Sequence, residues 1–146
     1  MSDQKSFIIN EHNSVVNKPV EFYNDNRDFT SLEAWKKCRE VKLFFYNKIL
    51  PCLPKEEKFN LDFQIRKVSV SSTSNISEGY GRYHYQEGIQ FYRISRASLY
   101  ELKDHLISCF DLGYIGNDLK TEGEQLLEEA KMTLIGYINF VKSKIK

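Results

Sequence analysis

Apolar side chains recur at steps of three and four along most of this chain, which is the spacing of a helix that buries one face. The first such segment covers residues 29–50, and Pro51 and Pro54 should end it. Thr30 followed by Glu33 matches a capping box, whose hydroxyl and carboxylate satisfy free backbone N–H groups at a helix start. The side chains expected on the inward face are Leu32, Trp35, Cys38, Val41, Phe45 and Ile49.

Three further segments, residues 60–79, 84–112 and 117–145, repeat this spacing. The stripe of the second is Leu61, Ile65, Val68, Ser72 and Ile76, and that of the third is Phe91, Ile94, Ser98, Leu102 and Leu106. The fourth carries Leu119, Leu126, Ala130, Leu134, Tyr137, Val141 and Ile145. No convincing strand alternation appears, so the pattern predicts an all-α protein, an antiparallel up-down-up-down four-helix bundle.

Polar residues and glycines mark the ends of these segments. Either Asn60 or Asp62 can cap the start of the second. Gly79 is its expected stop, because glycine readily adopts the left-handed conformation that closes a helix. Gly113 should stop the third segment, and the connections between the helices are therefore expected to be short.

The bundle accounts for residues 29–146, whereas residues 1–28 lack helical periodicity and are predicted to be an extended or mobile arm. A chain of 146 residues, 41% of them hydrophobic, can bury one core without disulfides or metal. Cys38, Cys52 and Cys109 are odd in number and widely spaced, as expected of reduced thiols in a cytoplasm. Neither a signal-peptide pattern nor an apolar run of about 18 residues is present, so we expect a soluble cytoplasmic protein.

The net charge is only +1, but the charges are unevenly distributed. Residues 32–103 hold 13 Lys/Arg against 8 Asp/Glu, whereas residues 104–130 hold 1 against 7. The positive part could steer a nucleic acid or an acidic partner, although lysines on an outward helix face ordinarily serve solubility. Three tyrosines within residues 80–85 lie near Arg82, and arginine beside aromatic rings can contact phosphates and bases. The candidate nucleic-acid contacts are Lys36, Lys37, Arg39, Lys42, Arg66, Lys67, Arg82, Arg93 and Arg96.

The segment NISEGYGR, residues 75–82, raises the question of acid–base chemistry, because Glu78 has a counterpart in Glu101 on the next predicted helix. In an antiparallel hairpin that turns near Gly81, residue n lies roughly level with residue 163 − n, which separates the two carboxylates by about 24 Å. They cannot share a proton or a metal within one chain. The segment is instead predicted to belong to a structural polar motif consisting of Asn75, Glu78, Gly79, Ser98 and Glu101.

The same register offers these polar groups partners inside the bundle. A satisfied polar pair in the interior helps to fix which helices meet and in what register. The predicted pairs are Arg66 with Glu101, Arg82 with Glu78, and Asn75 with the space beside Gly88.

Metal and cofactor chemistry find little support in the sequence. Glu101, His105 and Cys109 share one helix face, but a single stripe lacks a fourth ligand and its end atoms are about 12 Å apart. The Glu-x-x-His motifs of di-metal bundles do not occur, and the glycines of GYGR lack the lysine and spacing of a phosphate loop. We therefore expect no metal, no cofactor and no enzymatic activity.

Several stretches together resemble one known family. They are LEAWKKCREV (32–41), Pro54, Glu57, NLDFQIRKVSVSSTSNISEGYGR (60–82), FYRISRASLYEL (91–102) and DLGYI (111–115). This order resembles the four-helix-bundle family of 23S rRNA intervening-sequence proteins over about residues 29–146, most specifically in Asn-Ile-x-Glu-Gly followed by Ser-Leu-x-Glu-Leu. The resemblance implies a small bacterial cytoplasmic protein that assembles as a homopentameric barrel and has no enzymatic activity. It also implies kinship with the accessory protein of diversity-generating retroelements, which binds nucleic acid and a reverse transcriptase.

The residues and the resemblance together favour a non-enzymatic, homo-oligomeric helical scaffold, most simply a ring of five. Its basic surface is expected to bind RNA or DNA, or a nucleic-acid-processing protein. A reverse transcriptase or another protein encoded nearby is the expected protein partner, and no membrane contact is expected. The alternative is a protein–protein interaction module that makes no direct contact with nucleic acid.

Overall fold

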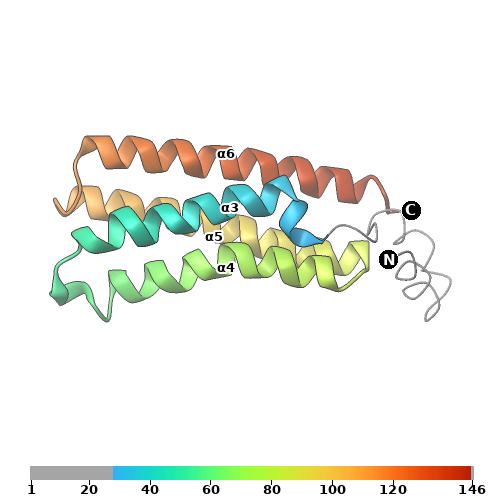
Figure 1. The fold of residues 1–146 in the computed structure, drawn as a ribbon, viewed down its shortest axis with the longest axis horizontal. Helices are drawn as coiled ribbons and strands as arrows, with labels where there is room; N and C mark the ends of the chain where they lie inside the picture. Colours follow the sequence, from blue (N-terminus) through green and yellow to red (C-terminus); the bar gives the residue numbers. More distant parts are fainter. Residues whose placement is uncertain (1–27, 146) are drawn as a thin grey trace.

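The computed structural model describes residues 28–145, which form four long helices lying side by side, with no strand among them (Figure 1). The helices are α3 (Glu33–Phe44), α4 (Leu61–Gly81), α5 (Tyr85–Asp111) and α6 (Asn117–Lys142). The shorter turns are η2 (Phe29–Ser31) before α3, and the π turn η3 (Phe45–Ile49), η4 (Leu50–Cys52) and η5 (Lys55–Glu57) after it. α4 packs between α3 and α5, and α6 packs between α5 and α3. The predicted all-α helical bundle is confirmed.

The start of the first helix differs from the prediction. The predicted arm, residues 1–28, lies outside the described residues apart from Asp28, whose carboxylate accepts a hydrogen bond from the Thr30 backbone N–H at 3.1 Å. This contact caps η2, and α3 begins after it without a capping side chain. Glu33 pairs instead with Lys36 at 3.4 Å. The prediction of a capping box at Thr30 and Glu33 is wrong, because the upstream Asp28 accepts the hydrogen bond of the Thr30 N–H in a separate turn.

The inward face of the first helix is largely as predicted. Its buried members are Cys38, Val41, Phe45 and Ile49, and its half-buried members are Leu32 and Trp35. The pattern missed Ala34 and Phe44, which are also buried. The wider π turn that begins at Phe45 lets two successive phenylalanines face the core, with ring centroids 5.5 Å apart in a T-shaped contact.

A residue that the pattern did not select caps the start of α4. The Asn60 side chain makes no capping hydrogen bond, and Asp62 pairs with Arg66. Glu57 Oε1 accepts a hydrogen bond from the Leu61 backbone N–H at 3.2 Å and another from the Asn60 amide at 3.1 Å. The choice of Asn60 or Asp62 as the cap is wrong, because the turn η5 brings the Glu57 carboxylate back to the helix start.

The far end of α4 also corrects the prediction. The predicted stripe Leu61, Ile65, Val68, Ser72 and Ile76 is buried, but the helix runs past Gly79 to Gly81. The left-handed residue of the following turn is Tyr83, with φ of 58°. Gly79 is required for a different reason, since a Cβ there would lie 2.7 Å from Cε1 of Tyr92. Gly113, with φ of 80°, follows the end of α5 as predicted.

The buried face of α5 is rotated from the predicted stripe. Ser98, Leu102 and Leu106 are buried as predicted, whereas Ile94 is 48% exposed and Phe91 is only half-buried. The buried face is completed by Gly88, Ile89, Tyr92, Ser95, Leu99 and Cys109. At the start of the helix the predicted stripe was one position off, because the large apolar Phe91 and Ile94 were chosen where Tyr92 and Ser95 are buried.

The stripe of α6 is nearer to the prediction. Ala130, Leu134 and Val141 are buried. The partly buried members that pack against the core are Leu119, Leu126, Tyr137 and Ile145. Gly123, Leu127 and Ile138 complete the buried face, so the helix contributes a wider apolar face than the pattern indicated.

α4 and α5 meet through small polar side chains. Ser71 Oγ lies 2.8 Å from Ser98 Oγ, and Ser95 Oγ donates a hydrogen bond to the Ser72 carbonyl at 2.6 Å. Residue 72 thus lies opposite residue 95, about one turn from the predicted register, because α4 runs on to residue 81. The two glutamates of the polar motif are still about 18 Å apart along the helices, so they cannot form one acid–base site within a chain.

Candidate nucleic-acid interface

Two of the four candidate cations on α3 already face carboxylates. Lys36 Nζ lies 3.4 Å from Glu33, and Lys37 Nζ lies 3.7 Å from Glu129 of α6. The two lysines and their two glutamate partners are partly or well exposed to solvent. Exposed ion pairs of this kind contribute little to stability, so these lysines can exchange a carboxylate for a phosphate at small cost.

The other two cations on α3 contact uncharged groups. The Arg39 guanidinium lies over the Trp35 ring, 5.9 Å from its centroid. Lys42 Nζ donates a hydrogen bond to Thr73 Oγ1 of α4 at 3.1 Å. Lys42 therefore helps to join α3 to α4, which makes it less available to a ligand than Arg39.

The two arginines at either end of α4 are each held by a carboxylate and a ring. Arg66 Nε lies 2.6 Å from Asp62 Oδ1, and its guanidinium lies 5.4 Å from the centroid of the Tyr46 ring. Arg82 lies 3.4 Å from Glu78, as predicted, and 4.9 Å from the centroid of the Phe91 ring. Each guanidinium is oriented by these contacts while its remaining N–H groups stay on the surface.

The remaining three candidates carry charge that is not neutralised nearby. Within residues 28–145, Lys67, Arg93 and Arg96 form no ion pair shorter than 4 Å. Lys67 lies on α4 and the two arginines on the neighbouring α5. The nine candidates thus extend over three helices, with α4 between the α3 group and the α5 group. Within residues 28–145 five of them form no ion pair: Lys67, Arg93 and Arg96 on the adjoining helices α4 and α5, and Arg39 and Lys42 on α3.

The structural polar motif joins α4 to α5 through one amide and two hydroxyls. Asn75 Nδ2 donates to the Ser71 carbonyl and to Ser71 Oγ, both at 2.9 Å, and Ser71 Oγ meets Ser98 Oγ. The predicted position of Asn75 beside Gly88 is wrong, because Gly88 packs against Gly79. The amide acts within its own helix and orients the serine that reaches across.

The second glutamate of the motif has a different partner from the one predicted. Glu101 Oε2 lies 3.1 Å from His105 Nε2, one turn along the same helix. Arg66, its predicted partner, pairs with Asp62. An aspartate four residues away on the same helix is reached more easily than a glutamate on the next helix.

Two of the three thiols, Cys38 and Cys109, are buried and protonated, whereas Cys52 is exposed. Burial raises the pKa of the Cys38 thiol to about 12 and, together with the nearby Glu57 and Cys52, raises the pKa of the Cys109 thiol to about 11. The thiol rather than the reactive thiolate is therefore the stable form of both. No group of three or more His, Cys, Asp or Glu side chains within residues 28–145 is arranged to hold a metal ion.

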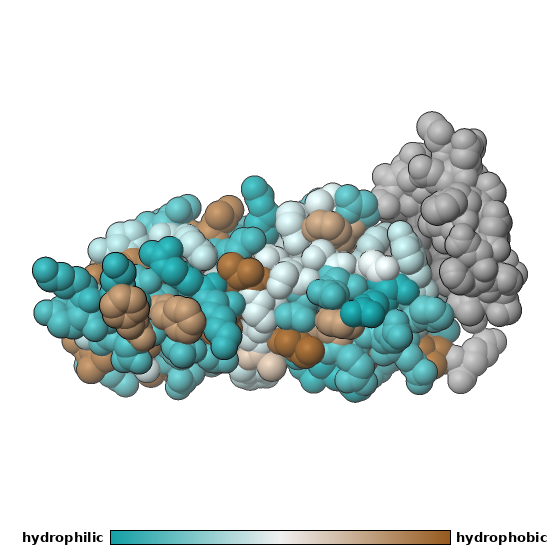
Figure 2. All heavy atoms as spheres, turned by 90° about the horizontal axis from the view of Figure 1, so that it is seen from below, coloured by the Kyte–Doolittle hydropathy of each residue, from teal (hydrophilic) through white to brown (hydrophobic). Residues whose placement is uncertain are grey.

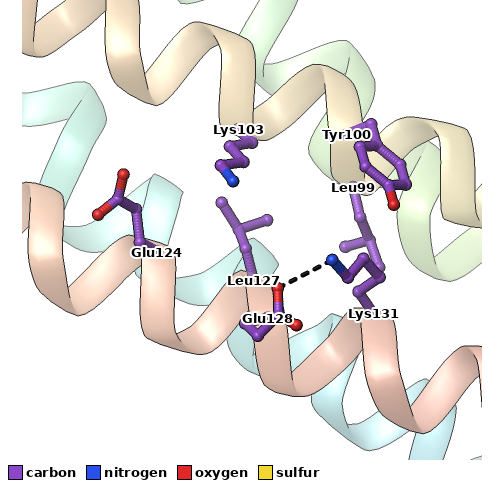
Figure 3. Close-up of a pocket in the computed structure, with 7 residues that line it drawn as sticks. All are labelled: Leu99, Tyr100, Lys103, Glu124, Leu127, Glu128 and Lys131. Carbon is purple, nitrogen blue, oxygen red and sulfur yellow. Dashed lines mark ion pairs between the residues drawn. The ribbon is translucent and has the colours of Figure 1, made fainter.

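A shallow groove between α5 and α6 is lined by charged side chains (Figure 3). Lys131 Nζ lies 2.9 Å from Glu128 Oε1 and 5.4 Å from the centroid of the Tyr100 ring. The hydrogen bond to Glu128 raises the pKa of Lys131. Glu124 and Lys103 line the same groove, so its charges are mixed and it presents no concentrated positive surface.

Two exposed phenylalanines were not selected from the sequence. Phe59 is 86% exposed and Phe63 is 52% exposed, at the start of α4. Apolar patches stand among hydrophilic surface on the face that Figure 2 shows. The signal was present in the segment KFNLDFQIRK, residues 58–67, where two aromatic and three basic residues lie outside the predicted stripe.

No helix within residues 28–145 is both long and apolar enough to cross a membrane. No curated protein matches the chain in sequence. The family model of the 23S rRNA-intervening sequence protein matches residues 30–136, which is well over half of the chain and covers α3, α4, α5 and most of α6. The protein therefore belongs to the 23S rRNA-intervening sequence protein family.

Proposed function

We propose that this protein is a non-enzymatic, homo-oligomeric helical scaffold that binds nucleic acid, or a nucleic-acid-processing protein, through a basic surface. Its subunit is an antiparallel up-down-up-down four-helix bundle, and five subunits form a ring. The protein works in the cytoplasm, and it needs no cofactor. The observation that carries the proposal is the unpaired charge of Lys67, Arg93 and Arg96 on two adjoining helices, in a member of this family.

Unpaired cations favour a phosphate ligand for a simple reason. A cation that is already paired must give up its carboxylate before it can bind a phosphate, whereas an unpaired cation on the surface gives up only water and releases counterions from the nucleic acid. A ring repeats each such patch once in every subunit, which raises the avidity for one long strand without requiring a strong single site.

Exposed apolar side chains on the same two helices support the oligomer. Val70 on α4 is 46% exposed and Ile94 on α5 is 48% exposed. Burying such side chains against a second copy would stabilise an assembly by roughly 25 cal/mol for each Å² of apolar surface removed from water. Sedimentation equilibrium should give five times the mass of one chain, and a monomer at micromolar concentration would rule out the ring.

Binding should be tested with two triple variants of equal net charge. Lys67→Gln, Arg93→Gln and Arg96→Gln together remove these three unpaired cations of α4 and α5, whereas Lys120→Gln, Lys131→Gln and Lys142→Gln together remove three lysines from α6. Affinity for labelled RNA and DNA is measured by fluorescence anisotropy at several salt concentrations. The first variant should reduce the slope of log affinity against log salt by about 0.9 for each duplex phosphate that it no longer neutralises, and the second should bind as the wild type does.

The same measurement can contradict the proposal. If the affinity for nucleic acid changes neither with salt concentration nor in the first variant, the basic surface does not contact nucleic acid. The alternative function, a protein–protein interaction module without direct nucleic-acid contact, would then be favoured.

A further inference from the structure

The two exposed phenylalanines at the start of α4 are unusual surface residues. Phe59 stands between η5 and α4 and leaves most of its ring in solvent, and Phe63 follows one helical turn later. Neither belongs to the hydrophobic core. Large aromatic rings placed one turn apart in water represent a cost in solvation free energy that a ligand would relieve.

Lysines without an ion pair flank these two phenylalanines along the chain. Lys58 Nζ lies 5.4 Å from the centroid of the Phe59 ring, and Lys67 lies one turn beyond Phe63. Neither lysine forms an ion pair within residues 28–145, and the same is true of Lys55. The segment therefore presents rings and free cations side by side.

The carboxylates of this segment are mostly engaged elsewhere. Glu57 accepts hydrogen bonds from the Leu61 backbone N–H at 3.2 Å and from the Tyr114 hydroxyl at 2.7 Å. Asp62 is paired with Arg66 at 2.6 Å. Glu56 is the one remaining acidic residue between residues 55 and 67, so the available charge around the rings is positive.

We propose that this segment binds single-stranded nucleic acid, with bases stacked on Phe59 and Phe63 and phosphates held by Lys58 and Lys67. This inference rests on the proposed function and specifies the form of the ligand. A nucleotide carries its phosphate a few ångströms from its base, which matches a ring with an ammonium group beside it. Bases within a duplex are stacked on one another, so only an unpaired strand can offer them to a protein ring.

Tyr100 on α5 provides a matched comparison within the same molecule. Its ring is 53% exposed and also has a lysine over it, Lys131 at 5.4 Å (Figure 3). Lys131 is paired with Glu128, and Glu124 lines the same groove. These carboxylates repel phosphate, so an exposed ring beside a lysine at this place should not bind a strand.

The experiment compares an unstructured 12-nucleotide strand with a hairpin duplex, using fluorescence anisotropy on the full chain. The double variant Phe59→Leu with Phe63→Leu keeps apolar side chains and removes both rings, and Tyr100→Leu is the control. Base stacking on one aromatic ring contributes roughly tenfold in affinity. The double variant should therefore weaken single-strand binding by tenfold or more, with an unchanged salt dependence and unchanged duplex affinity, while Tyr100→Leu binds as the wild type does.

Each of the other outcomes decides between the two proposals. If the wild type binds nucleic acid and the double variant binds the single strand equally well, the stacking site is overturned and the proposed function stands. If the wild type binds neither oligonucleotide, the stacking site and the nucleic-acid part of the proposed function are both overturned, and the alternative of a protein–protein interaction module is favoured. Circular dichroism of each variant shows that a loss of binding does not come from unfolding.

Discussion

Along one side α5 meets α4 through glycine and serine, and along the other side it meets α6 through leucine and tyrosine. On the α4 side, Gly88 packs against Gly79, and Ser95 donates a hydrogen bond to the Ser72 carbonyl. On the α6 side, the rings of Tyr92 and Tyr137 meet in a T-shaped contact, with centroids 5.0 Å apart. One helix thus takes part in a close contact of small residues and in a wider contact of large ones.

The two contacts limit the positions of the helices in different ways. Small residues allow the two backbones to approach, and the hydrogen bonds between them are satisfied in only one register. Large apolar side chains fill volume and tolerate small shifts if the volume is conserved. We therefore expect the α4–α5 contact to determine register, and the α5–α6 contact to supply more of the hydrophobic stability.

We expect the greatest loss of stability from a substitution that disrupts the α5–α6 contact. Leu106 is fully buried and its Cδ2 lies against Gly123 of α6. Leu106→Ala should lower the free energy of unfolding by about 2–5 kcal/mol, since it loses transfer free energy and leaves a cavity. Urea denaturation followed by circular dichroism measures the change. Leu112→Ala, at an exposed position, should change it little, and equal effects of the two would contradict this account of the core.

A smaller loss of stability is expected from a substitution that disrupts the α4–α5 contact. A Cβ at Gly79 would lie 2.7 Å from the Tyr92 ring and 3.0 Å from the Gly88 carbonyl oxygen. Gly79→Ala should therefore destabilise the protein by about 1–3 kcal/mol through overpacking. Gly81→Ala, two residues later with open space around it, should be neutral or stabilising by up to about 1 kcal/mol. The same denaturation measurement distinguishes them, and a stable Gly79→Ala variant would show that the helices can separate freely.

A smaller effect tests the hydrogen bonds of the same contact. Ser95→Ala removes the 2.6 Å hydrogen bond to the Ser72 carbonyl and should cost about 1 kcal/mol of unfolding free energy. Ser69 is the matched control, because its Oγ is equally buried but has no hydrogen-bond partner within the described residues. Ser69→Ala should be neutral or stabilising. If thermal melting finds both variants equally destabilised, buried serines act here through packing alone.

We expect the smallest change in stability from a contact at one end of the bundle, between the turn before α4 and the segment after α5. Glu57 of η5 accepts a hydrogen bond from Tyr114, which follows α5, and this bond with the cap of Leu61 lowers the pKa of Glu57 below its ordinary value of 4.5. A lowered pKa contributes stability that is present above pH 4.5 and is lost as the pH falls through the folded-state value. Tyr114→Phe should reduce this acid-dependent part of the stability. Chemical denaturation between pH 3 and pH 7 checks it, with an unchanged pH profile as the contrary result.

The helices were predictable because their period is local. Positions such as Val41, Ile65 and Leu134 repeat at a spacing that only a helix uses to bury one face, and all three are buried. The caps were not predictable in the same way. Asp28 and Glu57 act through turns whose geometry places a carboxylate near a free N–H, and sequence spacing alone does not determine that geometry.

The candidate interface was predictable in its residue types and not in its contacts. The excess of basic residues in the first three helices was evident from the sequence, but Lys67 and Lys42 were equivalent there. In the folded chain Lys42 is hydrogen-bonded to Thr73 and Lys67 has no ion pair within residues 28–145. The exposure of Phe59 was missed because an aromatic residue outside a stripe has no predicted environment.

Residue order and period along one chain are enough to predict the four helical segments, most of their buried stripes and the family. The packing of the helices establishes the register of α4 against α5, the close approach at Gly79 and the partners of Asn75 and Glu101. These features could not be predicted from the sequence because hydrogen bonds and steric contacts act over only a few ångströms. Which groups come within that distance depends on how whole helices pack, and residue spacing along one helix does not contain that information.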